Sequence, residues 1–187
     1  MEAGALLHAP DSRNSPDCWA MKTREPFFSI ITPVFNPPLD AFEECIKSVI
    51  NQSFEDWEWC LVDDAGAKSE MKDILRELAA SDNRIRISSR GTNGGIVAAS
   101  NDAIAMARGH FICLLDHDDS LATEALEHVH EALSGDESVD YLYTDEDKVD
   151  ARGSYYDAFL KPDWSPERLR GQNYCCHFSV KIGRAHV

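Results

Sequence analysis

Apolar positions divide the chain into alternating strand-like and helix-like segments from residue 27 onward. The segment Phe27–Phe35, FFSIITPVF, is almost wholly apolar and β-branched, which is typical of a strand buried on both faces. Five further apolar runs predict strands at 56–64, 84–88, 110–115, 139–147 and 174–180. Apolar residues at helical spacing predict helices at 39–50, 67–80, 96–107 and 121–133. Ser165 followed by Pro166 predicts the start of one more helix.

The alternation of strands and helices predicts the fold class. Strands joined through helices form right-handed βαβ crossovers, which place the strands parallel in one sheet. We therefore expect an α/β protein with an open, mostly parallel sheet and helices on both faces. A chain of 187 residues suits one domain.

The amino-acid composition narrows the classes of binding partner and the cell compartments that we expect. Asp and Glu number 33 against 18 Lys and Arg, a formal charge of −15, and no basic cluster offers a footprint for nucleic acid. No apolar run reaches the roughly 18–20 residues of a transmembrane segment. The six cysteines form no CxxC pair, which favours a reducing compartment. We expect a location in the cytoplasm or at the inner face of the membrane.

The two ends of the chain differ from its middle. Residues 1–26 have no apolar periodicity and no signal-peptide pattern, so we expect a disordered tail there. The last seven residues, KIGRAHV, resemble translated sequencing adapter. We therefore expect the native domain to occupy residues 27–180 and residues 181–187 to be a non-native tail.

Acidic residues follow three of the predicted strands, in LVDDAG, LLDHDDS and YTDED. Ligands of open α/β sheets bind beyond the carboxyl ends of the strands, and these acids all belong to that edge. Clustered carboxylates repel one another unless a cation intervenes, and Mg²⁺ or Mn²⁺ is the natural partner for their oxygens. Such a cation would hold a diphosphate and neutralise a leaving group. Alternatively, Asp116 is a nucleophile that takes up a phosphoryl group, with Asp118 as acid/base, as in HAD-like aspartyl-phosphate phosphatases.

Several segments together resemble family 2 glycosyltransferases of the GT-A fold, a Rossmann-like architecture. They are FSIITPVFN, SVINQSFEDWEWCLVDDAG, NGGIVAASNDAIAMARGHFICLLDHDD and YTDEDK. FLKPDWSPERLRGQNYCCHFSV resembles a bacterial subgroup that builds O-antigen and related surface polysaccharides. The resemblance covers Phe27 to Val180. It implies a nucleotide-sugar-binding domain that is incomplete at its C-terminus.

The resemblance implies roles for particular residues. Those implied to bind the nucleotide part of the donor are Pro33, Val34, Asn36, Asp63, Asp64, Asn93, Gly94 and Gly95. Asp64 would hydrogen-bond the base ring, whereas Asp63 would lie near the ribose or only cap a turn. Asp116 and Asp118 match the DXD motif of the metal site, with Asp118 a direct ligand and Asp116 at the ribose or a metal-bound water. Asp119 would orient the donor sugar.

Four later residues are candidates for contact with the acceptor or the donor sugar: Asp145, Glu146, Trp164 and His177. A solvated acidic loop explains Asp145 and Glu146 equally well, and core packing explains Trp164. We favour an ordinary buried histidine for His177, and an exposed side chain without a role for His117. The catalytic base of this subgroup would follow the QNYCCHFSV segment, so no residue is assigned to it.

The resemblance implies an inverting, metal-dependent transfer of a sugar. The donor would be a nucleotide-diphospho-sugar, and the acceptor a saccharide or a lipid-linked molecule. Without the base, the fragment would bind donor and transfer sugar poorly. The alternatives are the phosphatase above and a nucleotide-sugar-binding module without turnover.

Overall fold

The computed structural model describes residues 25–66, 68–136, 138–150 and 152–182. Its strands are β1 (Phe28–Val34), β2 (Trp57–Asp63), β3 (Ile85–Ser89), β4 (Phe111–Leu114), β5 (Tyr141–Tyr143), β6 (Glu146–Val149), β7 (Tyr155–Phe159) and β8 (Ser179–Ile182). Its helices are α1 (Leu39–Ile50), α2 (Ser69–Ser81), α3 (Ile96–Met106), α4 (Ala125–Gly135) and α5 (Pro166–Gly171). None of these helices combines the length and apolar character needed to cross a bilayer.

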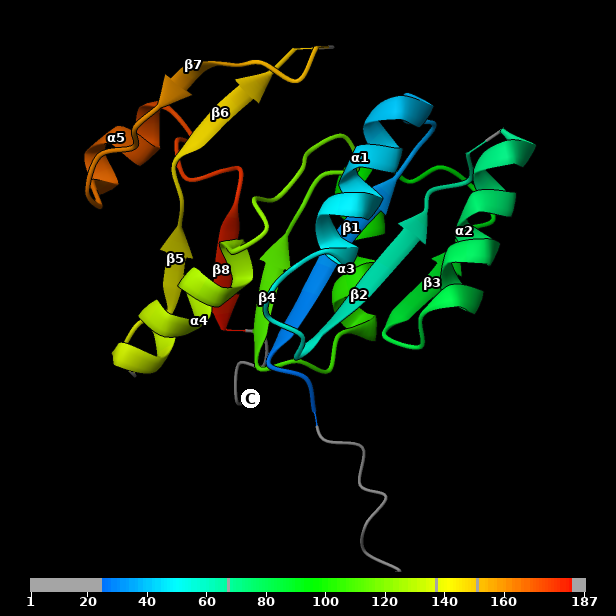
Figure 1. Ribbon diagram of the computed structural model, residues 1–187, viewed down its shortest axis with the longest axis horizontal. Coiled ribbons are helices and arrows are strands. Elements are labelled where there is room, and N and C mark those ends of the chain that lie inside the picture. The colour runs from blue at the N-terminus through cyan, green and yellow to red at the C-terminus, as the bar shows by residue number, and fades with distance from the viewer. Residues whose placement is uncertain (1–24, 67, 137, 151, 183–187) are drawn as a thin grey trace, which may run out of the picture.

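Six strands form one sheet in the order β3-β2-β1-β4-β8-β5 (Figure 1). β1, β2, β3 and β4 run parallel to one another, and β8 is antiparallel to both β4 and β5. β5 therefore runs in the same direction as β4. The predicted α/β class with a mostly parallel sheet is confirmed, and the carboxyl ends of β1 to β5 share one edge.

Helices cover both faces of the sheet, as predicted (Figure 1). The larger core joins alternate residues of β1, including Phe28, Ile30 and Val34, to apolar side chains of α1, α2 and α4. The opposite face packs Ile31 and its neighbours against Ala99 and Ala103 of α3. Because successive strand residues point to opposite faces, a strand covered on both sides must be apolar throughout, which explains why all of β1 is buried.

The region after β4 departs from the prediction. The expected strand at 139–147 is wrong in its second half, because β5 ends at Tyr143 and Glu146 begins β6. β6 pairs with β7 in a separate two-stranded sheet. Both strands are largely exposed, and Tyr155 is 77% exposed. Because neither face of these strands is buried, the sequence has no alternation of apolar and polar residues that would predict them. The predicted cap is present, since the Ser165 hydroxyl accepts a hydrogen bond from the Arg168 N–H.

The predicted boundaries near the two ends shift as well. The last strand starts at Ser179, not at Tyr174, and it continues through Ile182, past the predicted domain end at Val180. The predicted N-terminal tail lies outside the described residues except for Glu25 and Pro26, and so do residues 183–187. The division of the chain into tail, domain and adapter remains a prediction.

Candidate nucleotide-sugar site

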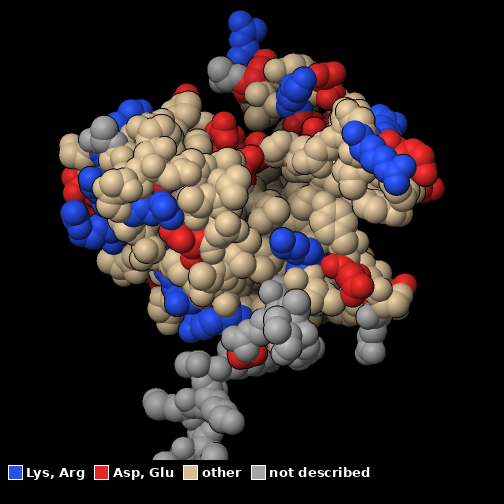
Figure 2. Space-filling view, turned by 180° about the vertical axis from the view of Figure 1, so that it is seen from behind, with Lys and Arg blue, Asp and Glu red and all other residues tan. Residues whose placement is uncertain are grey.

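A pocket of about 400 Å³ opens at the carboxyl edge of the sheet. Its lining residues come from the ends of β1, β2 and β4 and from the start of α3: Pro33, Val34, Phe35, Asp64, Asn93, Gly95, Ile96, Ala99, Asp116, His117 and Asp118. This edge is the upper one in Figures 1 and 2, and Figure 2 shows acidic side chains beside a hollow there. Seven of the residues predicted from the sequence therefore share one cavity: Pro33, Val34, Asp64, Asn93, Gly95, Asp116 and Asp118.

The buried Asp64 carboxylate organises one wall of the pocket. Its two oxygens accept hydrogen bonds from the backbone N–H groups of Gly94 at 2.8 Å and Gly95 at 2.7 Å. Arg90 Nε lies 3.0 Å from the same carboxylate, and the Arg90 guanidinium also contacts Asp102. The Asn93 side chain donates to the Asp64 carbonyl at 3.3 Å. Asp64 thus fixes the NGG loop against the end of β2.

Four residues predicted to bind donor are not in the pocket lining of the described chain: Asn36, Asp63, Gly94 and Asp119. Asp63 is almost fully buried, and its carboxylate accepts a hydrogen bond from the Gly66 N–H at 2.9 Å. This contact matches the turn-capping alternative. A Cβ at Gly66 would approach the side-chain oxygens of Asp63 and Asn36 to 3.0 and 3.1 Å, so Asn36 belongs to the same turn.

The acidic loop after β4 forms the opposite wall. His117 Nδ1 lies 3.0 Å from the Pro33 carbonyl oxygen, which joins this loop to the end of β1. His117 is half-buried in the pocket wall, so the expectation of an exposed side chain was wrong. That this side chain has no role remains a prediction. Burial raises the pKa of Asp119, and the charges of Asp116 and Asp118 add to the effect against the opposing influence of His177.

A buried thiol lies beneath this loop. Cys45 of α1 donates through Sγ to the Asp116 carbonyl at 3.7 Å. Burial, together with the neighbouring carboxylates, raises the pKa of the Cys45 thiol to about 12. The thiol is therefore protonated at neutral pH and packs as a small apolar group.

His177 comes from the segment before β8 and reaches the acidic loop. Its Nδ1 lies 2.8 Å from the Asp119 carboxylate and 3.8 Å from the Asp116 carboxylate. The side chain is 45% exposed, so the interpretation as a buried histidine was wrong. One ligand atom from each of Asp116, Asp119 and His177 lies within 4.8 Å of the others. Asp118 is not part of this cluster, although it lines the pocket.

Two of the other late candidates, Asp145 and Glu146, contact Lys161. Glu146 forms an ion pair with the Lys161 ammonium at 2.9 Å, and Asp145 accepts from the Lys161 backbone N–H at 2.7 Å. Trp164 is 56% exposed and lies edge-on to Tyr141 at 6.4 Å between ring centroids. Core packing therefore does not account for Trp164.

Comparison with known protein families shows which family this chain belongs to. The sequence profile of Glycosyl transferase family 2 matches residues 29–181, which is most of the chain. The chain belongs to glycosyl transferase family 2. The segments with the pocket and the acidic loop thus lie within the matched domain of a glycosyltransferase, as their resemblance implied.

Two relatives are named for the biosynthesis of O-antigen and of teichuronic acid. The chain is 40% identical over 161 residues to the O-antigen biosynthesis protein RfbC of Myxococcus xanthus, covering 86% of this chain and 13% of RfbC. It is 31% identical over 149 residues to the putative teichuronic acid biosynthesis glycosyltransferase TuaG of Bacillus subtilis, covering 80% of this chain and 57% of TuaG. The chain therefore spans only part of the length of the curated relatives it matches.

A solved glycosyltransferase shares the fold. The structure of S. aureus TarS 1–349 in complex with UDP superposes with a TM-score of 0.56 and 27% identity, over 62% of this chain and 34% of that one. This likeness agrees with the expected GT-A architecture.

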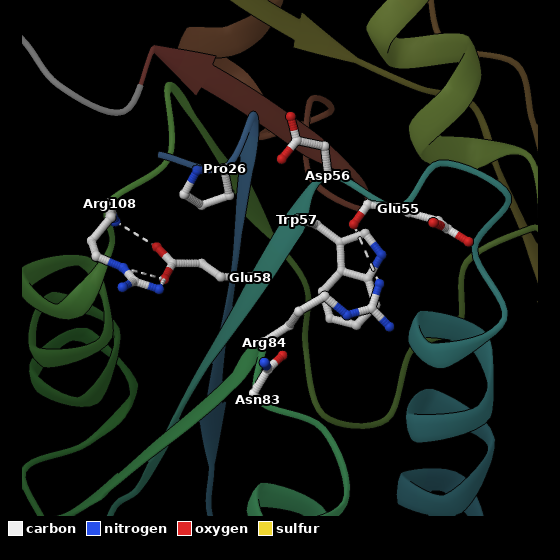
Figure 3. Close-up of a pocket in the computed structure, with 8 residues that line it drawn as sticks. All are labelled: Pro26, Glu55, Asp56, Trp57, Glu58, Asn83, Arg84 and Arg108. Atoms are coloured by element: carbon white, nitrogen blue, oxygen red, sulfur yellow. Dashed lines mark hydrogen bonds and ion pairs between the residues drawn. The ribbon is translucent and has the colours of Figure 1, made fainter. Parts of the chain in front are cut away.

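A second cavity of this family 2 domain, of about 310 Å³, lies at the opposite edge of the sheet (Figure 3). The Arg84 guanidinium covers the Trp57 ring at 3.7 Å, and the buried Glu58 carboxylate faces Arg108. The arginines of this cavity are already paired within the protein, and the cavity lies at the amino ends of the strands. The pocket at the carboxyl edge is therefore the candidate site.

Sequence reasoning missed several residues of the family 2 pocket. Phe35, Ile96, Ala99 and His117 line it, and Arg90 supports Asp64. The sequence held a signal for Phe35 and Ile96, because these large apolar residues stand directly beside predicted ligand residues. The structure leaves them 47% and 61% exposed. The partner of Arg90 depends on how β2 and β3 pair, which the sequence does not state.

Proposed function

We propose that this domain binds a nucleotide-diphospho-sugar in the carboxyl-edge pocket, and that the protein containing it transfers the sugar to a saccharide or lipid-linked acceptor. One observation carries the proposal. The pocket belongs to a family 2 domain. On one side it has the glycine loop whose backbone N–H groups donate to Asp64, and on the other side it has the Asp116–Asp118 segment. Such a combination suits a ligand with a flat base at one end and a diphosphate at the other.

The apolar part of the pocket is the proposed base site. Phe35 and Ile96 offer exposed apolar surface beside the buried Pro33 and Val34, and Gly95 allows close approach because it has no side chain. Glycine also suits the backbone here, since Gly95 has a φ of 80°. The relative TarS was solved with UDP, which makes uridine the first nucleotide to test.

The acidic loop is the proposed diphosphate end. Asp116 and Asp118 line the pocket, and Asp116, Asp119 and His177 offer ligand atoms of the types that Mg²⁺ or Mn²⁺ accept. The chain thus fits a divalent cation, which would neutralise charge on the departing diphosphate. A net charge of −15 leaves an anionic donor dependent on such a cation.

Two further roles belong to the proposal. Asp64 would hold the loop beside the nucleotide, and Asp119 would orient the donor sugar. Trp164 offers an exposed ring for stacking on a sugar. An acceptor hydroxyl would attack the anomeric carbon from the side opposite the diphosphate and invert its configuration. No described residue is assigned as the base.

Family membership removes the support for an aspartyl-phosphate phosphatase, because the acidic loop belongs to the matched glycosyltransferase domain. The alternative of a binding module without turnover can be distinguished from the proposal by one measurement. If the alternative holds, the full-length protein binds nucleotide-sugar but does not consume it, even when acceptor is supplied.

Calorimetry with UDP tests the proposal on this chain. We expect binding that strengthens when Mn²⁺ is added, and loss of that metal-dependent gain in Asp118→Ala. Asp73→Ala is the matched control, because Asp73 is an exposed acid on α2 that pairs with Arg76 away from the pocket. Absence of binding by UDP, GDP and their sugar conjugates, with or without Mn²⁺, would contradict the proposal.

A further inference from the structure

Arg90 contacts three elements around the carboxyl-edge pocket, although it is not among the residues that line it. It follows β3 directly, and its backbone N–H donates to the Asp63 carbonyl at 2.8 Å. Its Nε lies 3.0 Å from the carboxylate of Asp64 at the end of β2. Its Nη1 pairs with the carboxylate of Asp102 on α3. One side chain thus connects β2, β3 and α3 where the pocket opens.

The Arg90 guanidinium also lies against the glycine loop of the pocket wall. A Cβ added at Gly94 would lie 2.7 Å from Arg90 Nη2 and 3.2 Å from Arg90 Cζ. Arg90 Nη1 donates to the Ala98 carbonyl of α3 at 3.5 Å. Only 25% of the Arg90 side chain is exposed. The guanidinium is therefore held between the loop and the first turns of α3.

Arg90 supplies the counter-charge for a carboxylate that is otherwise held by backbone groups. The Asp64 side chain is 3% exposed, and its two oxygens accept from the N–H groups of Gly94 and Gly95. A buried carboxylate is costly unless it is paired and hydrogen-bonded. Arg90 is the one cation among the contacts described for Asp64. The loop geometry that Asp64 imposes therefore depends on Arg90.

A loop that is already in place binds a ligand more tightly than one that must first be ordered, because the cost of ordering it no longer opposes binding. Without Arg90, Asp64 would keep its two backbone hydrogen bonds and lose its counter-charge. Asp102 would lose the partner that ties α3 to the end of β2. The loop would then populate other conformations, and nucleotide affinity would fall with the fraction that remains competent.

We propose that Arg90 is a positioning residue of the nucleotide site. Through Asp64 and Asp102 it holds the Gly94–Gly95 loop in the conformation that receives the base. This role rests on the proposed function for the identity of the ligand, and it adds a residue outside the pocket on which nucleotide affinity depends. Arg90 itself does not touch the nucleotide, so its effect belongs to the base end of the donor and not to the diphosphate end.

Nuclear magnetic resonance titration with uridine, UMP and UDP, at one fixed Mg²⁺ concentration, separates positioning from attraction of charge. We expect Arg90→Gln to weaken the binding of all three ligands by the same factor, about 10-fold. An attraction between the guanidinium and phosphate would give a loss that grows from uridine to UDP. Arg90→Lys should not restore affinity, because lysine keeps the charge but lacks the planar fork that meets two carboxylates.

Arg76→Gln is the matched control for these titrations. Arg76 is exposed on α2 and pairs with Asp73, so its substitution removes an arginine and an ion pair away from the pocket. We expect the affinity of this variant for all three ligands to equal that of the unaltered chain.

Asp102→Asn is a milder variant that tests the link to α3, since the Asp102 side chain is 50% exposed. We expect it to weaken UDP binding by about 3-fold. In the Arg90→Gln background it should cause no further loss, because both substitutions break the same contact. Independent losses that multiply in the double variant would contradict a shared route through Arg90.

Amide hydrogen exchange of the free chain gives a readout that needs no nucleotide. Exchange at Gly94 and Gly95 should be faster in Arg90→Gln and in Asp102→Asn than in the unaltered chain, while Ile30 in the core of β1 keeps its protection. A general loss of stability would instead speed exchange at Ile30 as well. This comparison separates loss of the loop geometry from partial unfolding of the variant.

Three results would overturn the inference. They are unchanged UDP affinity in Arg90→Gln, a loss that grows with the number of phosphates, and unchanged exchange at Gly94 and Gly95 in both variants. Failure of the proposed function has a different signature, because the unaltered chain would then bind none of the three ligands. Hydrogen exchange would still report whether Arg90 holds the loop.

Discussion

The carboxylate of Asp64 accepts a hydrogen bond from the backbone N–H of Gly95 at 2.7 Å, across 31 residues of sequence. Its other oxygen accepts from Gly94, so one buried side chain at the end of β2 sets the entry into α3. The loop that we propose to face the nucleotide is thus positioned by an acid that the resemblance assigned to the base itself.

Asp64→Asn should loosen this loop. An asparagine amide group presents N–H groups where one carboxylate oxygen now accepts, and the ion pair with Arg90 is lost. Because hydrogen bonds to charged groups contribute about 1.5–3 kcal/mol, we expect the free energy of unfolding to fall by about 2 kcal/mol. Urea denaturation measures it, with the exposed Asp73→Asn expected to stay within about 0.5 kcal/mol. An equal, small change in both variants would contradict this role of Asp64.

Gly109→Ala should destabilise the protein through a steric clash in the core. A Cβ at this position would lie 2.7 Å from the Ser29 backbone nitrogen and 2.8 Å from the Phe28 carbonyl carbon. Backbone atoms of a central strand cannot move aside cheaply, so we expect a loss of about 1–3 kcal/mol in the free energy of unfolding.

Gly135→Ala is the matched control for this substitution. Among the described residues, no atom outside its chain neighbours and its own helix backbone lies within 4 Å of the position that its Cβ would take, at the end of α4. We expect unchanged or slightly higher stability, because alanine favours helix more than glycine does. If thermal melts showed equal losses for the two variants, close packing would not be the cause.

The sequence predicts the part of the fold in which burial repeats regularly. β1 is apolar throughout and α1 places Phe42, Cys45 and Val49 on one face, so both are visible as patterns. β6 and β7 are not, because their side chains meet solvent on both faces and no periodicity constrains them. The topology rule for parallel sheets then places Asp64 and Asp116 at one edge without further information.

The sequence cannot predict which hydrogen-bond donors contact the acidic side chains of the site. The partners of Asp64 are backbone groups 30 and 31 residues away, and backbone N–H groups carry no residue identity. His177 meets Asp119 only because β8 returns antiparallel beside β4. A short strand with two buried residues is too weak a pattern to fix that pairing in advance.

Glu58 should make the protein acid-sensitive at the edge opposite the pocket. Burial alone would raise the pKa of this carboxyl, but hydrogen bonds from Ser29 and Arg108 outweigh it and lower the pKa below the usual 4.5. A lowered pKa stabilises the fold above 4.5, and that stabilisation is lost as the pH falls through the folded-state pKa. We expect Glu58→Gln to lose about 2 kcal/mol near neutral pH.

The pH dependence separates charge from packing at Glu58. Urea midpoints of the unaltered protein should fall more steeply than those of Glu58→Gln once the pH passes below 4.5, so the two curves should converge. Parallel curves over the same range would mean that the Glu58 charge contributes nothing to the difference.

Trp164→Ala should leave stability nearly unchanged, although tryptophan is the largest side chain. The ring is 56% exposed, and its described aromatic neighbour is Tyr141 at 6.4 Å, so truncation removes little buried surface. Trp59 is the internal comparison, because it is fully buried and donates through its indole N–H to Thr32 at 2.9 Å. We expect Trp59→Ala to lose about 3–5 kcal/mol in urea denaturation. A comparable loss in Trp164→Ala would mean that this ring is packed after all, and its proposed use as a surface for sugar stacking would fall with that result.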